Sequence, residues 1–237
     1  MVSVDTVYQR VLALANKEQR GYITPQEFNL LANQAQMVIF DQYFYDLEKF
    51  DNDYGNETEY SDMVKTLNEK LSIFKKFDTA LVKNGSFFEY PVDMYKLGTL
   101  YYAPTSLLED GVEIEEIYYD QLLDYYNSPL TKPNKSRPLY IRREEGIRII
   151  SASAINSGVL ATYVRKPAKV NWGYVITLGE PMYNASAAVD FELHPSEETL
   201  LVIKILEMAG ITLNKPGLSQ LAAQEENDMI AQQKIKQ

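Results

Sequence analysis

The chain has 237 residues, a formal net charge of −10 and no cysteine, so disulfides, thiolate metal sites and cysteine nucleophiles are excluded. Its one histidine, His194, leaves histidine-based zinc sites and catalytic triads short of parts. So acidic a chain does not hold phosphate backbones by bulk electrostatics, which argues against ordinary nucleic-acid binding. No run is apolar enough for a membrane helix and the start lacks a secretory signal, so we expect a protein made and used without crossing a membrane.

Three helices are predicted in the N-terminal part of the chain. Apolar residues recur at helical spacing over residues 4–15. Thr24 and Glu27 form a capping box at the start of a helix over residues 25–50, whose apolar side chains lie on two stripes, so we expect packing on both sides. A third helix, over residues 60–74, is followed by two lysines suited to a helix C-terminus. Short turns between these helices imply a small bundle.

The pattern changes to a period of two near Phe77, which predicts strands. Asn84-Gly85 between two β-rich runs is typical of a hairpin. Further strands are expected over residues 94–102 and 112–119, followed by one or two helical turns. Residues 138–167 are interpreted as a three-stranded meander. We expect antiparallel pairing, because the connections are too short for crossover helices.

The last third of the chain begins with an irregular excursion over residues 167–190. A helix follows, with His194 or Ser196 as its cap and Gly210 as its stop. A final helical segment with a thin apolar face starts near Pro216. Its tail is too polar for the chain's own core, so it is either frayed or meant for a partner.

These elements predict an α+β fold, in which a helical bundle formed from both chain ends flanks a central antiparallel β-sheet or sandwich. The expected domains are an N-terminal helical bundle over 1–77 and an antiparallel β domain over 78–190. The third part, 191–237, holds C-terminal helices that return to the bundle and a polar tail.

The acidic stretch "DNDYGNETEYSD", residues 51–62, is a candidate calcium loop. An EF-hand loop needs ligands at positions 1, 3 and 5, glycine at 6 and glutamate at 12. With Asp51 first, Gly55 falls where a ligand is needed and Asn56 where the turn needs glycine. We therefore interpret the stretch as a helix–helix turn in which Gly55 ends one helix and acids begin the next.

The acids of residues 109–120 are candidates for paired-carboxylate or metal chemistry. Alternation places Glu113 and Glu115 on one strand face, which a solvated or lumen-facing surface explains without chemistry; together with Glu116 they are our lumen-facing candidates. At His194 we favour helix capping over a catalytic base. We expect no catalytic residue, no metal site and no cofactor.

Charge is distributed unevenly along the chain. Residues 41–62 hold eight acids and one base, residues 109–124 hold seven acids and no base, and residues 132–169 hold nine bases and two acids. These are either solvated faces that differ by chance or complementary surfaces that meet head to tail between subunits. On the second interpretation, the subunit-interface candidates are Arg142, Arg143, Arg148, Asp51 and Asp53.

Three stretches, "GYITPQEFNLLANQAQ", "GVLATYVRKP" and "ELHPSEETLLVIKILEMAG", resemble the adaptor or tail-tubular proteins of short-tailed phages and the ring proteins of crAss-like phages. The resemblance implies a helical bundle that docks beneath the portal, a β domain that extends away, and a dodecameric ring that prolongs the DNA channel. An acidic wall suits such a channel, because it repels phosphate and lets DNA pass without specific binding.

The function expected from this resemblance is that of a structural, non-enzymatic subunit of a phage neck, made in the host cytoplasm and located in the virion. Its partners would be further copies of itself, the portal and other neck or tail proteins, with no membrane. The alternatives are another head or tail accessory protein of the virion, a metal-dependent virion hydrolase, and a factor that never enters the particle. The candidates for docking on a neighbouring ring are Leu218, Leu221, Met229 and Ile230.

Overall fold

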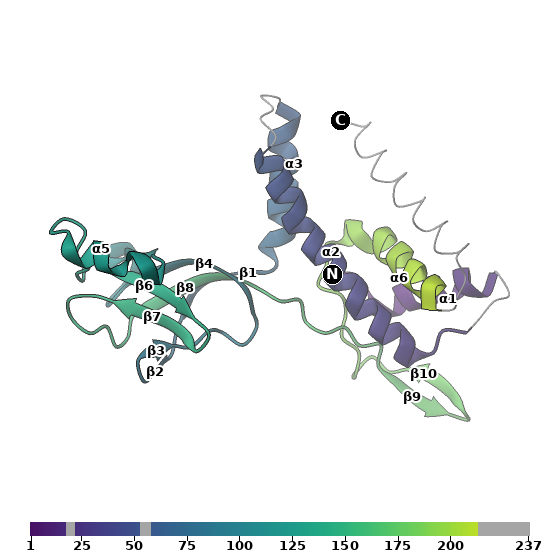
Figure 1. The fold of residues 1–237 in the computed structure, drawn as a ribbon. Coiled ribbons are helices and arrows are strands. Elements are labelled where there is room, and N and C mark those ends of the chain that lie inside the picture. Colours follow the sequence, from purple (N-terminus) through teal and green to yellow (C-terminus); the bar gives the residue numbers. More distant parts are fainter. Residues whose placement is uncertain (18–21, 53–57, 213–237) are drawn as a thin grey trace. The chain divides into compact units, whose positions relative to one another are not determined.

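The computed structural model describes residues 1–17, 22–52 and 58–212 and confirms an α+β fold (Figure 1). The chain divides into two compact units. A helical unit combines residues 1–73 with the segment that starts at Pro167, and a β unit comprises residues 74–166. No described helix is long and apolar enough to cross a membrane.

The helices of the helical unit form where apolar periodicity and capping predict them. The backbone N–H of Thr24 donates to Glu27 Oε2 at 2.9 Å and that of Glu27 donates to Thr24 Oγ1 at 3.3 Å, so the capping box is confirmed. The long second helix contacts the third and the last helix, and the first also contacts the last. The bounds are α1 (Val4–Lys17), α2 (Pro25–Asn52), α3 (Thr58–Ser72) and α6 (Glu198–Thr212).

Three details of these helices differ from the sequence prediction. The lysines expected at the end of α3 belong to strand β1, which begins at Lys75. Helix α6 does not stop at Gly210 but continues to Thr212. On α2, Leu30 and Val38 are exposed, so the apolar residues of this helix are only partly covered by the described residues.

The segment after Pro167 belongs to the helical unit, although the sequence places residues 167–190 with the β domain. It contains a hairpin of β9 (Tyr174–Thr177) and β10 (Glu180–Tyr183), which projects from the helices (Figure 1). The same segment also contacts the N-terminus, because Phe191 forms an antiparallel backbone bridge with Val2. The domain boundary therefore lies at residue 166 rather than 190.

Side-chain amides of α2 hold this segment in place. Asn33 Nδ2 donates to the Val170 carbonyl at 2.8 Å, while Asn33 Oδ1 accepts from the Val170 N–H at 2.9 Å. The Trp172 N–H donates to Asn29 Oδ1 at 2.7 Å. The spacings match, because one helical turn and two residues of extended chain both span roughly 6 Å. We name these residues the amide ladder: Asn29, Asn33 and Gln36, the last of which donates to the Ala168 carbonyl.

Aromatic rings complete the attachment of the hairpin. The Trp172 ring lies 4.4 Å from the Tyr8 ring and stacks on Tyr174 at 6.0 Å, and its Nε1–H donates to Asp5 Oδ1 at 2.9 Å. The buried Tyr8 ring also contacts Phe28 at 4.6 Å. The hairpin base is thus fixed to both α1 and α2 by buried rings whose polar atoms have partners.

The β unit contains one eight-stranded sheet in the order β1-β8-β4-β5-β6-β7-β3-β2. The expectation of purely antiparallel pairing is wrong at one place, because β5 runs parallel to β6. The connection over residues 117–138 is long enough for this parallel pairing, since a parallel crossover needs about a dozen residues. The bounds are β1 (Lys75–Ala80), β2 (Lys83–Asn84), β3 (Phe87–Phe88), β4 (Met94–Tyr102), β5 (Val112–Glu116), β6 (Leu139–Arg143), β7 (Gly146–Ile150) and β8 (Val159–Arg165).

The sheet curls until its two outermost strands are consecutive in the chain. Only Leu81 and Val82 separate β1 from β2; the Leu81 N–H donates to the carbonyl of Val159, and the Glu89 N–H donates to the carbonyl of Val82. The Asn84-Gly85 turn between β2 and β3 is confirmed, with Gly85 at φ +60. The predicted meander is interrupted, because β8 pairs with β1 and β4 and not with β7.

Two apolar clusters stabilise the curled sheet. The inner cluster gathers residues of β3 to β8, including Leu100, Tyr140 and Ile147. The outer cluster contains Leu139 and Ile141, which α5 covers from the other side (Figure 1). The first three residues of β6, Leu139 to Ile141, are buried on both faces for this reason, whereas its two arginines are exposed. The helical elements of the connection are α4 (Leu107–Asp110), η1 (Tyr119–Gln121) and α5 (Leu122–Asn127).

Candidate functional site

A groove opens in the β unit where β5 changes its pairing partner. Over Val112 to Ile114 the strand pairs with β4, and at Glu115 and Glu116 it pairs with β6. From Met94 to Leu97, β4 pairs with β8 alone, and its register is irregular between Leu97 and Leu100. The sheet therefore splits, and the resulting cavity has a volume of about 510 Å³. It is lined by Gly98, Thr99, Leu100, Glu113, Ile114, Glu115, Glu116, Arg137 and Tyr140.

The three lumen-facing candidates all line this groove. Ile114 is buried between the exposed Glu113 and Glu115, which confirms the predicted alternation along β5. Glu116 is also exposed, and the strand ends there before the buried Ile117. Glu113 and Glu115 share one face of β5, whereas Glu116 lies opposite Tyr140 on the other face. Whether the three carboxylates face a channel stays a prediction.

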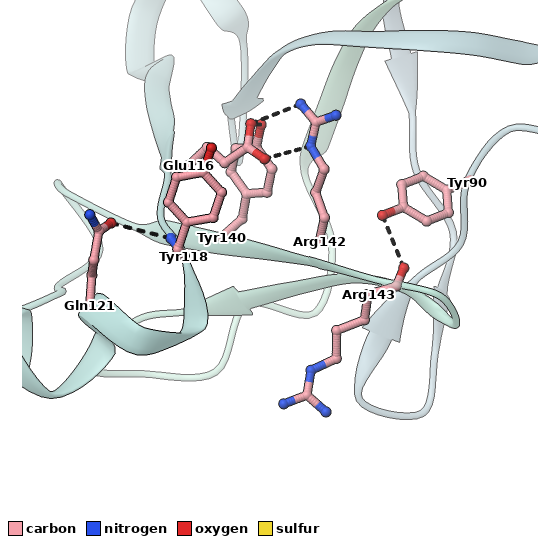
Figure 2. A network of polar contacts seen from close by, with 7 residues as sticks. All are labelled: Tyr90, Glu116, Tyr118, Gln121, Tyr140, Arg142 and Arg143. Atoms are coloured by element: carbon pink, nitrogen blue, oxygen red, sulfur yellow. Dashed lines mark hydrogen bonds and ion pairs between the residues drawn. The ribbon is translucent and has the colours of Figure 1, made fainter.

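Glu116 is held in a charged network with β6 (Figure 2). Its carboxylate oxygens lie 2.6 Å from Arg142 Nε and 2.8 Å from Arg142 Nη2, a two-point ion pair. The Tyr140 hydroxyl donates to Glu116 Oε2 at 2.9 Å. The parallel register explains this arrangement, because it places Glu116 opposite Tyr140, two residues before Arg142.

Tyr140 is the most strongly perturbed group of the groove. Burial raises the pKa of Tyr140 to about 12, and its hydrogen bond to Glu116 adds to the rise while Arg142 opposes it. The hydroxyl therefore stays protonated at neutral pH and acts as a hydrogen-bond donor. A tyrosine in this state is suited to fixing the carboxylate in position.

Glu115 has a second set of partners. The Tyr125 hydroxyl of α5 donates to Glu115 Oε1 at 3.1 Å, and this hydrogen bond raises the pKa of Tyr125. Arg137 Nη2 lies 3.8 Å from Glu115 Oε2, with both side chains about half exposed. At that exposure the pair contributes little stability, because solvent screens it. Its effect is to orient the two charges at the rim of the groove.

The basic candidates lie on two neighbouring strands, Arg142 and Arg143 on β6 and Arg148 on β7. Arg142 is paired with Glu116 of its own chain, so it would enter any subunit interface as one half of an ion pair. Arg143 lies with its guanidinium carbon 5.3 Å from the Tyr119 ring centre, and its carbonyl accepts from the Tyr90 hydroxyl at 3.2 Å (Figure 2). Arg148 is exposed on β7.

Several other candidates lie outside the described residues. Asp51 is near the end of α2, but its side chain is not described, and Asp53 falls in the gap before α3. Most of the stretch over residues 51–62 therefore lacks described side chains, and its interpretation as a helix–helix turn stays a prediction. The candidates for docking on a neighbouring ring, Leu218, Leu221, Met229 and Ile230, are likewise outside the described part of the chain.

The capping role of His194 is confirmed. Its Nδ1 accepts from the Ser196 N–H at 3.3 Å, and Pro195 occupies the first turn of the short helix η2 (Pro195–Glu197). Within residues 1–17, 22–52 and 58–212, no three His, Asp or Glu side chains gather in a group that could hold a metal ion. The groove and its rim hold the Glu116–Arg142 and Glu115–Arg137 pairs together with the hydroxyls of Tyr140 and Tyr125.

Sequence reasoning missed both polar networks. The Glu116–Arg142 pair joins residues 26 apart and depends on the parallel register, for which the sequence contains no local signal. The amide ladder did leave a signal, because Asn29, Asn33 and Gln36 recur at helical spacing beside buried apolar residues of α2. Polar residues in such positions need partners when buried.

No family model matches this chain, and neither does any curated protein.

Proposed function

We propose that the chain is a structural subunit of a phage neck. Copies of it form a ring, which we expect to be dodecameric, and this ring joins the portal to the tail and extends the DNA channel. The observation that carries the proposal is the organisation of the chain. A helical unit contains both N-terminal and C-terminal segments, and a β unit with its own core is inserted between residues 73 and 167. The resemblance noted from the sequence implies the same order of elements.

The charges of the described surface support this role. Glu113 and Glu115 are exposed on one strand, and a surface of that sign repels a passing DNA backbone. Arg143 and Arg148 are exposed on the β6–β7 side. A ring needs two different surfaces that meet between neighbours, and opposite charges favour such a contact.

Native mass spectrometry over a concentration series, with imaging of the oligomer, tests the proposal. We expect a closed ring whose stability falls as salt rises, since exposed charges are screened beyond about 8 Å at physiological ionic strength. The double variant Arg143→Glu and Arg148→Glu should weaken assembly at low salt and flatten its salt dependence. Arg142 is left intact because it is paired within the chain.

Lys76→Glu is the control for reversing a positive charge elsewhere on the same unit. Lys76 is exposed on β1, outside the base-rich segment over residues 132–169. It should leave assembly unchanged. The proposed role of the basic surface is contradicted if the double variant assembles like the unmodified chain at every salt concentration. The neck assignment itself is contradicted if imaging of intact particles finds the protein elsewhere or absent.

A further inference from the structure

The groove between β4 and β5 leaves backbone hydrogen-bonding groups of β5 without a neighbouring strand. The N–H groups of Glu115 and Ile117 donate to carbonyls at the beginning of β6, at 3.2 and 3.0 Å. Peptide groups alternate sides along a strand, so the N–H and the carbonyl of Glu116 point away from β6 and toward the groove. The pairing of β5 with β4 ends at Ile114, and no described strand pairs with Glu116 on that side.

Strand β4 forms the other wall of the groove and is open on the same side. Its pairing with β5 begins only at Leu100, so the groove-lining Gly98 and Thr99 have no described strand on the groove side. A Cβ at Gly98 would lie 2.8 Å from the Thr162 carbonyl oxygen, so glycine lets β4 follow β8 closely where it leaves β5. A split sheet that is open on both walls can accept an extended peptide as a further strand.

The groove also contains a carboxylate that is available to a partner. Glu115 and Glu116 are held by side chains of their own chain, whereas Glu113 is exposed and bonds no described side chain. The buried Ile114 lies on the opposite face of β5 and belongs to the inner apolar cluster. The groove therefore favours a strand that presents a base on the Glu113 face and an apolar side chain on the inner face.

One segment of the chain outside the described residues has this pattern. Lys234, Ile235 and Lys236 follow one another, and nowhere else in the sequence does an apolar residue stand between two bases. We name these three residues the basic triplet. In an extended strand the two lysines would share one face and Ile235 would lie on the other, which complements the sequence Glu113-Ile114-Glu115 in charge and in alternation.

We propose that the basic triplet of one copy adds as a strand in the groove of a second copy of this chain. There a lysine meets Glu113, Ile235 meets the inner apolar cluster, and the peptide groups of Glu116 gain partners. The triplet and the groove are different surfaces of the chain, so their contact is head to tail and continues from copy to copy. The inference rests on the proposed function, because it names a contact between neighbouring subunits of the ring.

Zero-length crosslinking identifies the contact in the unmodified chain. A carbodiimide condenses a lysine amine with a carboxylate, so it links only groups that already touch. Light and isotopically heavy chains are mixed in equal amounts, and the crosslinked peptides are identified by mass. We expect Lys234 or Lys236 to be linked to Glu113 or Glu115 in mixed light–heavy pairs. Glu144, an exposed carboxylate between β6 and β7 of the same unit, should form no such link.

Charge reversal tests the same contact through assembly, measured by sedimentation velocity over a concentration series. Lys234→Glu combined with Lys236→Glu should weaken self-association at least about tenfold, because like charges then meet in the groove. Adding Glu113→Lys should restore much of the loss, since opposite charges face one another again. Adding Glu144→Lys in its place should restore nothing. Glu113 bonds no described side chain, so its replacement should leave the fold intact.

The outcomes separate this contact from the ring itself. If the unmodified chain forms a ring without these crosslinks, or the double lysine variant assembles normally, the groove contact is wrong and the ring stands. Crosslinks confined to one copy, or no restoration by Glu113→Lys, would also overturn the contact. If the unmodified chain shows no association at any concentration, contact between copies through the groove is overturned, whereas the neck assignment is decided by imaging of intact particles.

Discussion

At the residue scale, the Tyr140 side chain connects the inner apolar cluster with the charged network of the groove. Its ring is buried in that cluster and its hydroxyl donates to Glu116. Burial, assisted by the Glu116 hydrogen bond, raises the pKa of Tyr140 from 10.0 to about 12. The folded state therefore binds the phenolic proton more tightly than the unfolded state does.

This difference predicts a pH dependence of stability. A raised pKa gives a stabilising contribution that is complete below about pH 10 and is lost as the pH rises from about 10 to about 12. Tyr140→Phe should therefore show a smaller fall in unfolding free energy across that range, measured by urea titration at several pH values. Tyr126→Phe, at an exposed position on α5, is the control. Equal pH slopes for the unmodified chain and Tyr140→Phe would contradict the assignment.

At the scale of elements, the amide ladder replaces the missing neighbour strand of an extended segment. Asn33 satisfies both the N–H and the carbonyl of Val170, as a paired strand would. A peptide N–H or carbonyl that loses its hydrogen-bond partner lowers the stability of the fold more when it is partly buried than when it is exposed, because water cannot replace the partner. The position of the β9–β10 hairpin depends on this attachment.

Asn33→Ala should lower the unfolding free energy by roughly 1–3 kcal/mol, because it leaves the N–H and the carbonyl of Val170 without partners. Gln42→Ala is the matched control on the same helix, since the Gln42 side chain donates to Asp46 Oδ1 at 2.8 Å in a solvent-exposed hydrogen bond. Its cost should stay within about 0.5 kcal/mol. Chemical denaturation measures both; similar losses for the two variants would show that the ladder adds no stability.

At the scale of the whole molecule, the β unit is an insertion whose ends meet. The Arg165 N–H donates to the Phe74 carbonyl at 2.9 Å, and Lys75 pairs with Val164. Its inner apolar cluster contains residues of the β unit alone. Domains with adjacent ends and a separate core tolerate insertion and excision.

We therefore expect residues 74–166, expressed alone, to fold and to unfold in one cooperative transition with a free energy of roughly 5 kcal/mol, at the low end for a domain of this size. Urea denaturation followed by both circular dichroism and tyrosine fluorescence measures this. Transitions that differ between the two probes, or no transition at all, would show that the β unit needs the helical unit to fold.

Local signals in the sequence predicted local structure. The Thr24–Glu27 capping box and the Asn84-Gly85 turn each involve neighbouring residues, and both are confirmed. Contacts between residues far apart in the chain could not be predicted from such local patterns. The parallel pairing of β5 with β6, and with it the Glu116–Arg142 pair, depends on a crossover that no short pattern specifies. The assignment of Trp172 to the helical unit depends on amides 143 residues away.

Strand β1 gives the curled sheet a protected border. One of its edges pairs with β8, with a bulge between Lys76 and Thr79 where Asp78 has φ +51. Charged residues and a bulge on a border strand prevent a second chain from adding to it, which is how natural sheets avoid edge-to-edge aggregation. The ring proposed above would bring many copies side by side, and such an assembly needs this safeguard. The irregularity of β1 would allow crowding without polymerisation of the sheets.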